Sequence, residues 1–436
     1  MEQPVTPPAS DNAAQPQQFS STPRPARPLA RRRVRVVAGV AGLLVGALAL
    51  TACGGDAKAN DDGKDGKDSK SSDASAAKDA STLKITISAK DGSTNASIND
   101  VNVKAEGGKL SDVTMTEAQG GKAVPGTLAA DGLSWKPTGK VERGTQYKIT
   151  ANGKDDKGRA ATENAQFTTV SAKDSFIGTY TPDNGATVGV GMPVSFTFNK
   201  AITNKKDVLS HITVTSSSGQ QVVGHWFNST RLDFRPEQYW KAGSKVTMKI
   251  DLDKVEGAKG IYGVQSKEVT FTIGRNQVST VDVNTQKMTV QQDGKTIKTI
   301  PVSTGSAEHP TYNGQMVISE KFTQTRMNGD SVGFGGEYDI KDVPHAMRLS
   351  TSGTFMHGNY WYKGDPFGND GTSHGCVGMK DVQGAGGDTP AKWMFDHSLI
   401  GDVVVVKNSP DKPIAPDNGL NGWNMPWSQW TAAASS

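Results

Sequence analysis

One sequence pattern occurs twice in the chain, at a fixed offset of 99 residues. Leu-Ser-Trp-Lys-Pro at 133–137 returns as Leu-Asp-Phe-Arg-Pro at 232–236, and the glycine that opens 144–149 returns at the start of 243–250. A repeat at a fixed spacing indicates that one structural unit is used more than once. The repeat therefore predicts two copies of a unit of about 100 residues.

Each copy of the repeat is rich in strand signals. Short runs that alternate apolar and polar residues are separated by turns of Gly, Asn, Asp and Pro. This spacing is typical of antiparallel β-sandwiches. We therefore predict two immunoglobulin-like β-sandwiches, at 82–170 and 171–274. His211 and His225 in the second are expected to be ordinary surface or edge residues.

The chain stays strand-rich after the repeat but changes character. Alternating runs between Val278 and Val302 surround an Asp-Gly pair at 293–294, which predicts a tight hairpin. A Thr-Pro pair at 389–390 predicts a capped short helix. We expect a third, β-rich domain at 275–408, so the chain as a whole is predicted to be mainly β with little helix.

The C-terminal extension, 409–436, is rich in tryptophan. Trp423, Trp427 and Trp430 have the spacing i, i+4 and i+7, which would place them on one face of a helix. We expect them to pack against the third domain or the second sandwich. Direct binding of glycan is the alternative.

The N-terminus has the composition of an export signal. Basic residues at Arg31–Arg35 precede an apolar run, Val36–Leu50, and the ending Leu-Thr-Ala-Cys resembles the bacterial lipobox, in which the cysteine is lipidated. We predict a signal peptide at 1–52 and a lipid anchor on Cys53, with an uncleaved signal anchor as the alternative. Residues 53–81 lack large apolar side chains and are predicted to be a flexible linker.

The charge excludes one class of partner. The chain carries a formal net charge of +4, but loss of 1–52 would remove six arginines and two acidic residues and leave it neutral. Nucleic-acid-binding domains need a basic face. We therefore expect no nucleic-acid partner.

Cys376 lies in a polar, glycine-rich stretch. With Cys53 lipidated it has no disulfide partner. A thiol becomes a nucleophile as thiolate, so it needs a nearby base and donors for an oxyanion. His374 precedes it by two residues and His357 by nineteen.

Three other fates compete for Cys376. A buried inert cysteine is common, but the flanking residues are too polar for a plain core strand. A redox thiol would lack a resolving cysteine. A zinc site would need His374, His357 and a fourth ligand, and the sequence offers neither a further available cysteine nor an HExxH helix.

His357-Gly358 and the run Thr-Ser-His-Gly-Cys-Val at 372–377 resemble the signature of YkuD-type L,D-transpeptidases, which cross-link peptidoglycan. Two immunoglobulin-like domains, a catalytic domain and a Trp-rich tail are similar to actinobacterial, mycobacterial-type members over nearly all of the mature chain. The resemblance implies a lipoprotein outside the cytoplasmic membrane, facing the cell wall. It also implies no cofactor, no metal and covalent inhibition by carbapenem-type β-lactams.

The resemblance assigns the chemistry to named residues. Cys376 would attack the carbonyl of the third residue, a diamino acid, of a tetrapeptide stem, expel the terminal D-Ala and form a thioester. A neighbouring stem's amine would resolve the thioester as a 3→3 cross-link. His357 would be the general base, oriented by the backbone carbonyl of Gly358. The Cys376 N–H, His374 and a tyrosine of the lid would stabilise the oxyanion and shape the pocket.

The resemblance also implies a substrate pocket. Tyr338 is the best match for a tyrosine of the lid, with Tyr312 and Tyr360 as alternatives. Ser373 and Gly375 would contact the substrate.

One position departs from the family pattern. Gly378 stands where the family usually has Arg or Asn, so a side-chain contact that orders the loop or anchors substrate is missing. Two other functions remain open: an L,D-carboxypeptidase, in which water accepts the acyl group, and a non-catalytic wall-binding lipoprotein.

Overall fold

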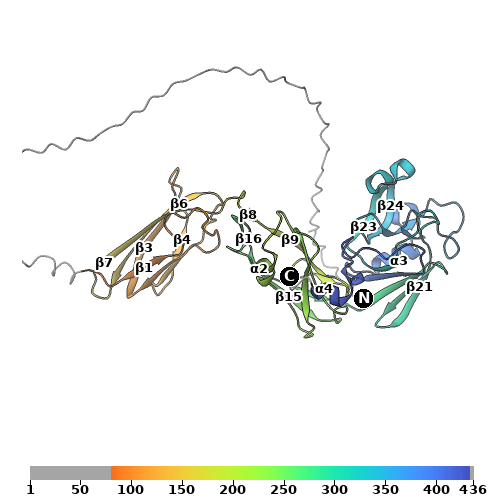
Figure 1. The fold of residues 1–436 in the computed structure, drawn as a ribbon, viewed down its shortest axis with the longest axis horizontal. Coiled ribbons are helices and arrows are strands. Elements are labelled where there is room, and N and C mark those ends of the chain that lie inside the picture. Colours follow the sequence, from red (N-terminus) through yellow and green to blue (C-terminus); the bar gives the residue numbers. More distant parts are fainter. Residues whose placement is uncertain (1–79, 433–436) are drawn as a thin grey trace, which may run out of the picture. The chain divides into compact units, whose positions relative to one another are not determined.

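The structure is a computed structural model that describes residues 80–432. The predicted signal peptide, the lipid anchor at Cys53 and nearly all of the predicted linker lie outside these residues and stay predictions. Strands dominate the described residues, which confirms the mainly β architecture (Figure 1). No helix within 80–432 is long and apolar enough to cross a membrane.

The first body has two sheets around one hydrophobic core, with strand orders β1-β2-β5-β4 and β3-β6-β7. Its long strand β6 alternates exposed and buried side chains, and Tyr147, Ile149 and Ala151 point into the core. The strands are β1 (Lys84–Ile87), β2 (Val103–Glu106), β3 (Gly108–Glu117), β4 (Gly126–Leu128), β5 (Ser134–Pro137), β6 (Gln146–Asp155) and β7 (Ala160–Thr168).

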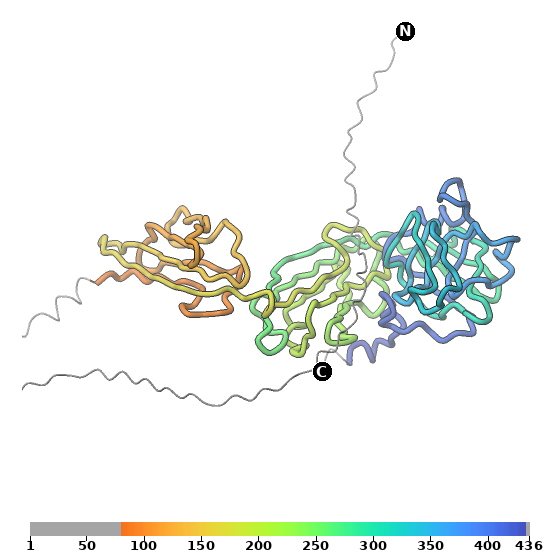
Figure 2. Tube along the Cα trace, turned by 90° about the horizontal axis from the view of Figure 1, so that it is seen from above, coloured from red at the N-terminus to blue at the C-terminus, as the bar shows by residue number. Residues whose placement is uncertain are grey.

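The second body repeats this plan with sheets β13-β14-β11-β9 and β10-β18-β15-β12, and a small sheet β16-β17-β8. Most of its strand pairs are antiparallel, but β10 with β18 and β17 with β8 are parallel. The strands lie side by side in the chain trace (Figure 2). Its elements are β8 (Ser175–Phe176), β9 (Gly178–Thr181), β10 (Thr187–Val188), β11 (Val194–Phe198), α2 (Lys205–Ser210), β12 (Ile212–Ser216), β13 (Val222–Trp226), β14 (Arg231–Pro236), β15 (Lys245–Asp251), β16 (Glu256–Ala258), β17 (Ile261–Gly263) and β18 (Ser266–Ile273).

The third body is built on one nine-stranded sheet with the order β22-β27-β19-β20-β21-β26-β25-β24-β23. Most pairs are antiparallel, but β19 with β27 and β25 with β26 are parallel. The strands are β19 (Gln277–Asp282), β20 (Lys287–Gln292), β21 (Lys295–Ser303), β22 (Gly314–Val317), β23 (Glu320–Asn328), β24 (Asp339–Arg348), β25 (Phe355–Asn359), β26 (Val377–Lys380) and β27 (Val403–Lys407).

Two local predictions for the third body are confirmed. The hairpin turn has Asp293 at φ 51° and Gly294 at φ 76°, the left-handed conformations that a tight two-residue turn needs. Helix α3 (Pro390–Asp396) begins at Thr389, whose side chain accepts a hydrogen bond from the Lys392 N–H. This helix packs against the apolar core of the nine-stranded sheet.

The tryptophans of the tail do not share one helix. Trp423 lies in the 3-10 turn η4 (Gly422–Asn424) and the other two in α4 (Trp427–Ala432). Pro426 separates these elements, because it lacks an N–H and restricts the residue before it. All three indole rings nevertheless surround one guanidinium, that of Arg235 on β14, at 4.3–5.2 Å.

Indole hydrogen bonds also hold the tail to the second sandwich. Trp423 Nε1 donates to the Gly191 carbonyl at 2.7 Å, and Trp430 Nε1 donates to the Val223 carbonyl at 2.9 Å. The expected packing against the second sandwich is therefore observed.

Candidate active site

Two neighbouring parallel strands bring His357 and Cys376 together. His357 lies in β25, and Cys376 is the residue directly before β26. The register pairs Met356 with Val377 and His357 with Gly378. The hydrogen-bond ladder between the strands therefore sets the spacing of histidine and cysteine, although 18 residues separate them in the chain.

The His357 ring is buried and has a defined tautomer. Its Nδ1 lies 2.9 Å from the backbone carbonyl of Gly358, which can only accept, so Nδ1 carries the proton. Burial lowers the pKa of His357, while the Gly358 carbonyl and the charge of Asp381 oppose that effect. The Trp361 ring stacks on the imidazole with centroids 5.6 Å apart. His357 therefore rests neutral, with Nε2 free to accept a proton.

Cys376 rests as a thiol. Burial raises its pKa to about 11, and a hydrogen bond from the Phe355 backbone N–H opposes this effect. The Sγ atom also lies 3.6 Å from the Gly353 carbonyl, which can accept only from a protonated sulfur. A neutral imidazole can accept the proton of a nearby thiol as substrate binds, so the site does not need a preformed ion pair.

A cavity of about 150 Å³ contains both groups, and five of the predicted site residues line it. Burial, with the charges of Cys376 and Glu337, raises the pKa of Tyr338 to about 12, so its hydroxyl stays protonated and can donate. The five residues are Tyr338, His357, Ser373, His374 and Cys376.

The two alternative tyrosines lie elsewhere. Tyr312 packs against the core of the sheet, and the Tyr360 hydroxyl donates to Asp342. Tyr362, which the sequence did not single out, also lines the cavity.

Ser373 and Gly375 shape the loop that presents the thiol. The Ser373 hydroxyl donates to the carbonyl of Cys376 at 2.7 Å and accepts from the N–H of Gly375 at 3.2 Å. Gly375 has φ +103°, a conformation that residues with a Cβ rarely adopt. The structure thus gives both residues a local backbone role.

His374 is held by two residues that precede β24. Its Nε2 lies 2.8 Å from Glu337 Oε2, and its ring contacts Tyr338 with centroids 4.9 Å apart. Glu337 belongs to a short 3-10 turn, η2 (Gly335–Glu337), which follows η1 (Gly329–Val332). Residues 329–338 are called the lid segment below.

Sequence reasoning missed a buried carboxylate behind the histidine. Asp381 directly follows β26, and its Oδ2 bonds to Nδ1 of His345 at 2.7 Å. Its Oδ1 accepts from the hydroxyl of Thr389 at 2.8 Å. A Cβ on Gly358 would lie 1.9 Å from Asp381 Oδ2, so the carboxylate packs directly against the backbone whose carbonyl orients His357. Only the pairing of β25 with β26 reveals this contact.

Replacing Gly358 by alanine is expected to destabilise the protein by about 1–3 kcal/mol, because the new methyl group would displace the buried Asp381 carboxylate. Gly378→Ala is the matched control, since a Cβ there meets nothing closer than 3.5 Å, the Ser303 carbonyl. Its expected effect is below about 1 kcal/mol. Urea unfolding of both variants measures the difference, and equal losses would contradict the packing described.

The space around Gly378 also shows whether the strand requires a glycine where the family usually has Arg or Asn. Ordinary van der Waals space surrounds this glycine, and its φ is not positive. The strand therefore does not require glycine here, and the missing side chain leaves the pairing with His357 intact.

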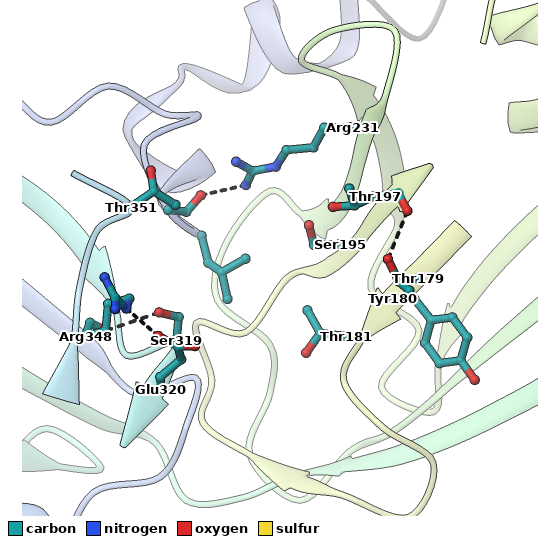
Figure 3. Close-up of a pocket in the computed structure, with 12 residues that line it drawn as sticks. Thr179, Tyr180, Thr181, Ser195, Thr197, Arg231, Ser319, Glu320, Arg348 and Thr351 are labelled. Atoms are coloured by element: carbon teal, nitrogen blue, oxygen red, sulfur yellow. Dashed lines mark hydrogen bonds and ion pairs between the residues drawn. The ribbon is translucent and has the colours of Figure 1, made fainter. Parts of the chain in front are cut away.

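A larger cavity, of about 610 Å³, lies away from the thiol. Figure 3 shows Arg231, Arg348 and Glu320 at its wall, together with threonines of β9 and β11. Arg231 donates to the carbonyl of Gly419 at 2.6 Å. The lining contains no cysteine or histidine, so this cavity does not compete as a site of thiol chemistry.

Two parts of the chain match known families. Residues 276–406 match the L,D-transpeptidase catalytic domain, YkuD, and residues 91–256 match a bacterial Ig domain. L,D-transpeptidase 2 of Mycobacterium tuberculosis is 31% identical over 353 residues, which cover 80% of this chain and 84% of that protein. L,D-transpeptidase 5 of the same species is 26% identical and covers 76% and 72%.

Solved structures give a weaker likeness. The structure of LD transpeptidase LdtMt1 in complex with imipenem is 24% identical, with a TM-score of 0.44 over 52% of this chain and 97% of that chain. A structure of an L,D-transpeptidase from Mycobacterium smegmatis is 23% identical, with a TM-score of 0.41 over 52% and 97%.

Proposed function

Because this chain belongs to the L,D-transpeptidases, we propose that it joins peptidoglycan stem peptides by 3→3 cross-links through a thioester on Cys376. The donor is a tetrapeptide stem, and its terminal D-Ala is released. The observation that carries the proposal is the hydrogen bond from His357 Nδ1 to the Gly358 carbonyl, because it leaves Nε2 as the basic atom in the cavity that holds the thiol.

The first half-reaction forms the acyl-enzyme. Nε2 of His357 takes the thiol proton while Sγ of Cys376 attacks the carbonyl carbon of the third stem residue. The backbone N–H of Cys376 and the hydroxyl of Tyr338 donate to the oxyanion, a role for which the raised pKa of Tyr338 keeps its proton available. The C–N bond to D-Ala then breaks, and the imidazolium returns its proton to the leaving amine.

The second half-reaction regenerates the thiol. The side-chain amine of a neighbouring stem attacks the thioester carbonyl, His357 takes a proton from that amine, and the C–S bond breaks as Cys376 recovers a proton. One amide bond forms for each one broken, so the reaction needs neither ATP nor a cofactor.

The rate of acylation is expected to fall on the acid side of neutrality. His357 must be unprotonated to act, and burial lowers its pKa below the ordinary value of about 6.5. Activity should therefore persist down to about pH 6.5 and decline only below it, where the imidazole gains a proton. A pH profile of kcat/KM tests this, and a decline that begins above pH 7.5 on acidification would contradict it.

The proposal is tested by mass spectrometry of products from a disaccharide-tetrapeptide with no other amine present. A cross-linked dimer that has lost one D-Ala supports the transpeptidase. Tripeptide alone would indicate a carboxypeptidase that uses water as acceptor. Unchanged substrate, with a folded protein, would favour a non-catalytic wall-binding lipoprotein.

We further propose that carbapenems acylate Cys376, because the strained β-lactam carbonyl presents the same electrophile to the thiol as the stem peptide. Incubation with imipenem is expected to add the mass of one inhibitor to the protein, on the peptide that contains Cys376. A labelled Cys376→Ala protein, or labelling elsewhere, would reject this assignment.

Localisation follows from the sequence signals and is proposed on that basis. Cleavage before Cys53 and lipidation of that residue would hold the enzyme on the outer face of the cytoplasmic membrane, and the two sandwiches would set its reach into the wall. A Cys53→Ser protein is expected to leave the membrane fraction, and retention there would favour an uncleaved anchor.

A further inference from the structure

Three side chains beside the cavity form a group that the proposed reaction does not use as a unit. His309 comes from the loop between β21 and β22, Glu337 from the lid segment, and His374 from the loop before Cys376. Their ligand atoms all lie within 4.8 Å of one another. We call His309, Glu337 and His374 the lid cluster.

Both imidazoles of the lid cluster direct Nε2 toward one carboxylate oxygen. Glu337 Oε2 lies 2.8 Å from Nε2 of His374 and 3.8 Å from Nε2 of His309. The two rings stack with centroids 4.9 Å apart and planes 18° from parallel. The Phe334 ring contacts both histidines edge-on, at 5.0 and 5.3 Å.

Two imidazole nitrogens and one carboxylate oxygen form a ligand set that zinc commonly takes, with a fourth position left for water. Bonds of about 2.0–2.2 Å to one tetrahedral zinc place ligand atoms about 3.3 Å apart. The separations of 2.8 and 3.8 Å lie on either side of this value, and all three ligand atoms lie within 4.8 Å of one another. The three side chains are partly exposed, so binding would require them to rotate around the ion.

We propose that the lid cluster binds a zinc-class divalent cation and that the bound ion inhibits the enzyme. The regulatory half of this proposal rests on the proposed function. The ion would join the lid segment to the loop that carries the thiol, and it would occupy His374. His374 and Tyr338, the residue after Glu337, both line the cavity. The bound ion would therefore hold these two side chains in place and restrict the entry of substrate.

This site differs from a zinc ion held by the catalytic thiol. The zinc set considered from the sequence used Cys376, His374 and His357, whereas the lid cluster shares only His374 with it. The reaction itself needs no metal, and removal of zinc should activate the enzyme.

The binding half is tested on the Cys376→Ala protein, because it lacks the thiol and needs no activity. Titration with zinc alone, by calorimetry or competition with a chromophoric chelator at fixed pH, is expected to show one ion per chain. His309→Gln, and separately Glu337→Gln, made in this background should weaken binding by more than about tenfold. The matched control is His211→Gln, at a half-exposed histidine on the second sandwich, which should leave the affinity for zinc unchanged.

The inhibitory half is tested on proteins that keep Cys376. Zinc should slow cross-linking by the wild type. The His309→Gln protein should keep its activity without zinc, because His309 does not line the cavity, and should need more than about tenfold more zinc for the same inhibition. Lack of binding to Cys376→Ala, unchanged affinity in His309→Gln, or equal inhibition of both active proteins would overturn the proposal. If the wild type makes no product, the titration still decides whether the metal site exists.

Discussion

The Cys376→Ala protein is expected to make neither cross-linked dimer nor tripeptide, with kcat lowered on the order of 10⁴-fold or more. The loss is this large because the thioester divides one difficult acyl transfer into two easier steps, and no other cysteine exists in the described residues to form it. Mass spectrometry of products after prolonged incubation measures residual activity.

The control for this substitution is the stability of the variant. The Cys376 sulfur makes a long hydrogen bond to the Gly353 carbonyl at 3.6 Å and a second one with the Phe355 backbone, so its removal should change the free energy of unfolding by only about 1 kcal/mol. A folded Cys376→Ala protein that still cross-links stems would remove the thioester mechanism.

The second large effect is expected from His357→Asn, which should lower kcat by about 10²–10⁴-fold. The asparagine amide occupies the place of Nδ1 and can still donate to the Gly358 carbonyl, but it has no counterpart of Nε2. The variant therefore removes the basic atom but keeps the hydrogen bond to the Gly358 carbonyl.

His397→Asn is a matched control for the same change of residue. His397 is exposed, and its Nδ1 bonds to the Trp393 carbonyl, a local contact that the asparagine can also make. It should keep kcat within about twofold. The His357→Asn protein should also lose the decline in activity at acid pH, and an intact decline would assign that titration to another group.

Local sequence was sufficient for much of the third domain. The Asp-Gly turn, the Thr-Pro start of α3 and the motif around Cys376 are each specified by neighbours in the chain. The family was also identifiable, and this identification is confirmed, because its signature is compact and its residue types are rare in combination.

The contacts that sequence reasoning missed join residues distant in the chain. His225, expected at the surface or an edge, does lie on the edge strand β13, but Trp430 covers it, and its Nδ1 bonds to the Trp430 carbonyl at 3.0 Å. Asp381 reaches the backbone of Gly358 only because β25 pairs with β26. Glu337 reaches His374 only because of the fold of the lid segment. The periodicity of a single sequence does not indicate which distant residues will be in contact.

The parallel pairing of β25 with β26 also bears on how such an enzyme can diversify. The ladder positions histidine and cysteine, so residues 360–372, the larger part of the connection between the two strands, do not have to hold them in place. This connection contributes Trp361, Tyr362 and Thr372 to the cavity wall. Insertions and deletions in this connection can therefore change the shape of the cavity wall, and with it the substrate that fits, while His357 and Cys376 keep their positions.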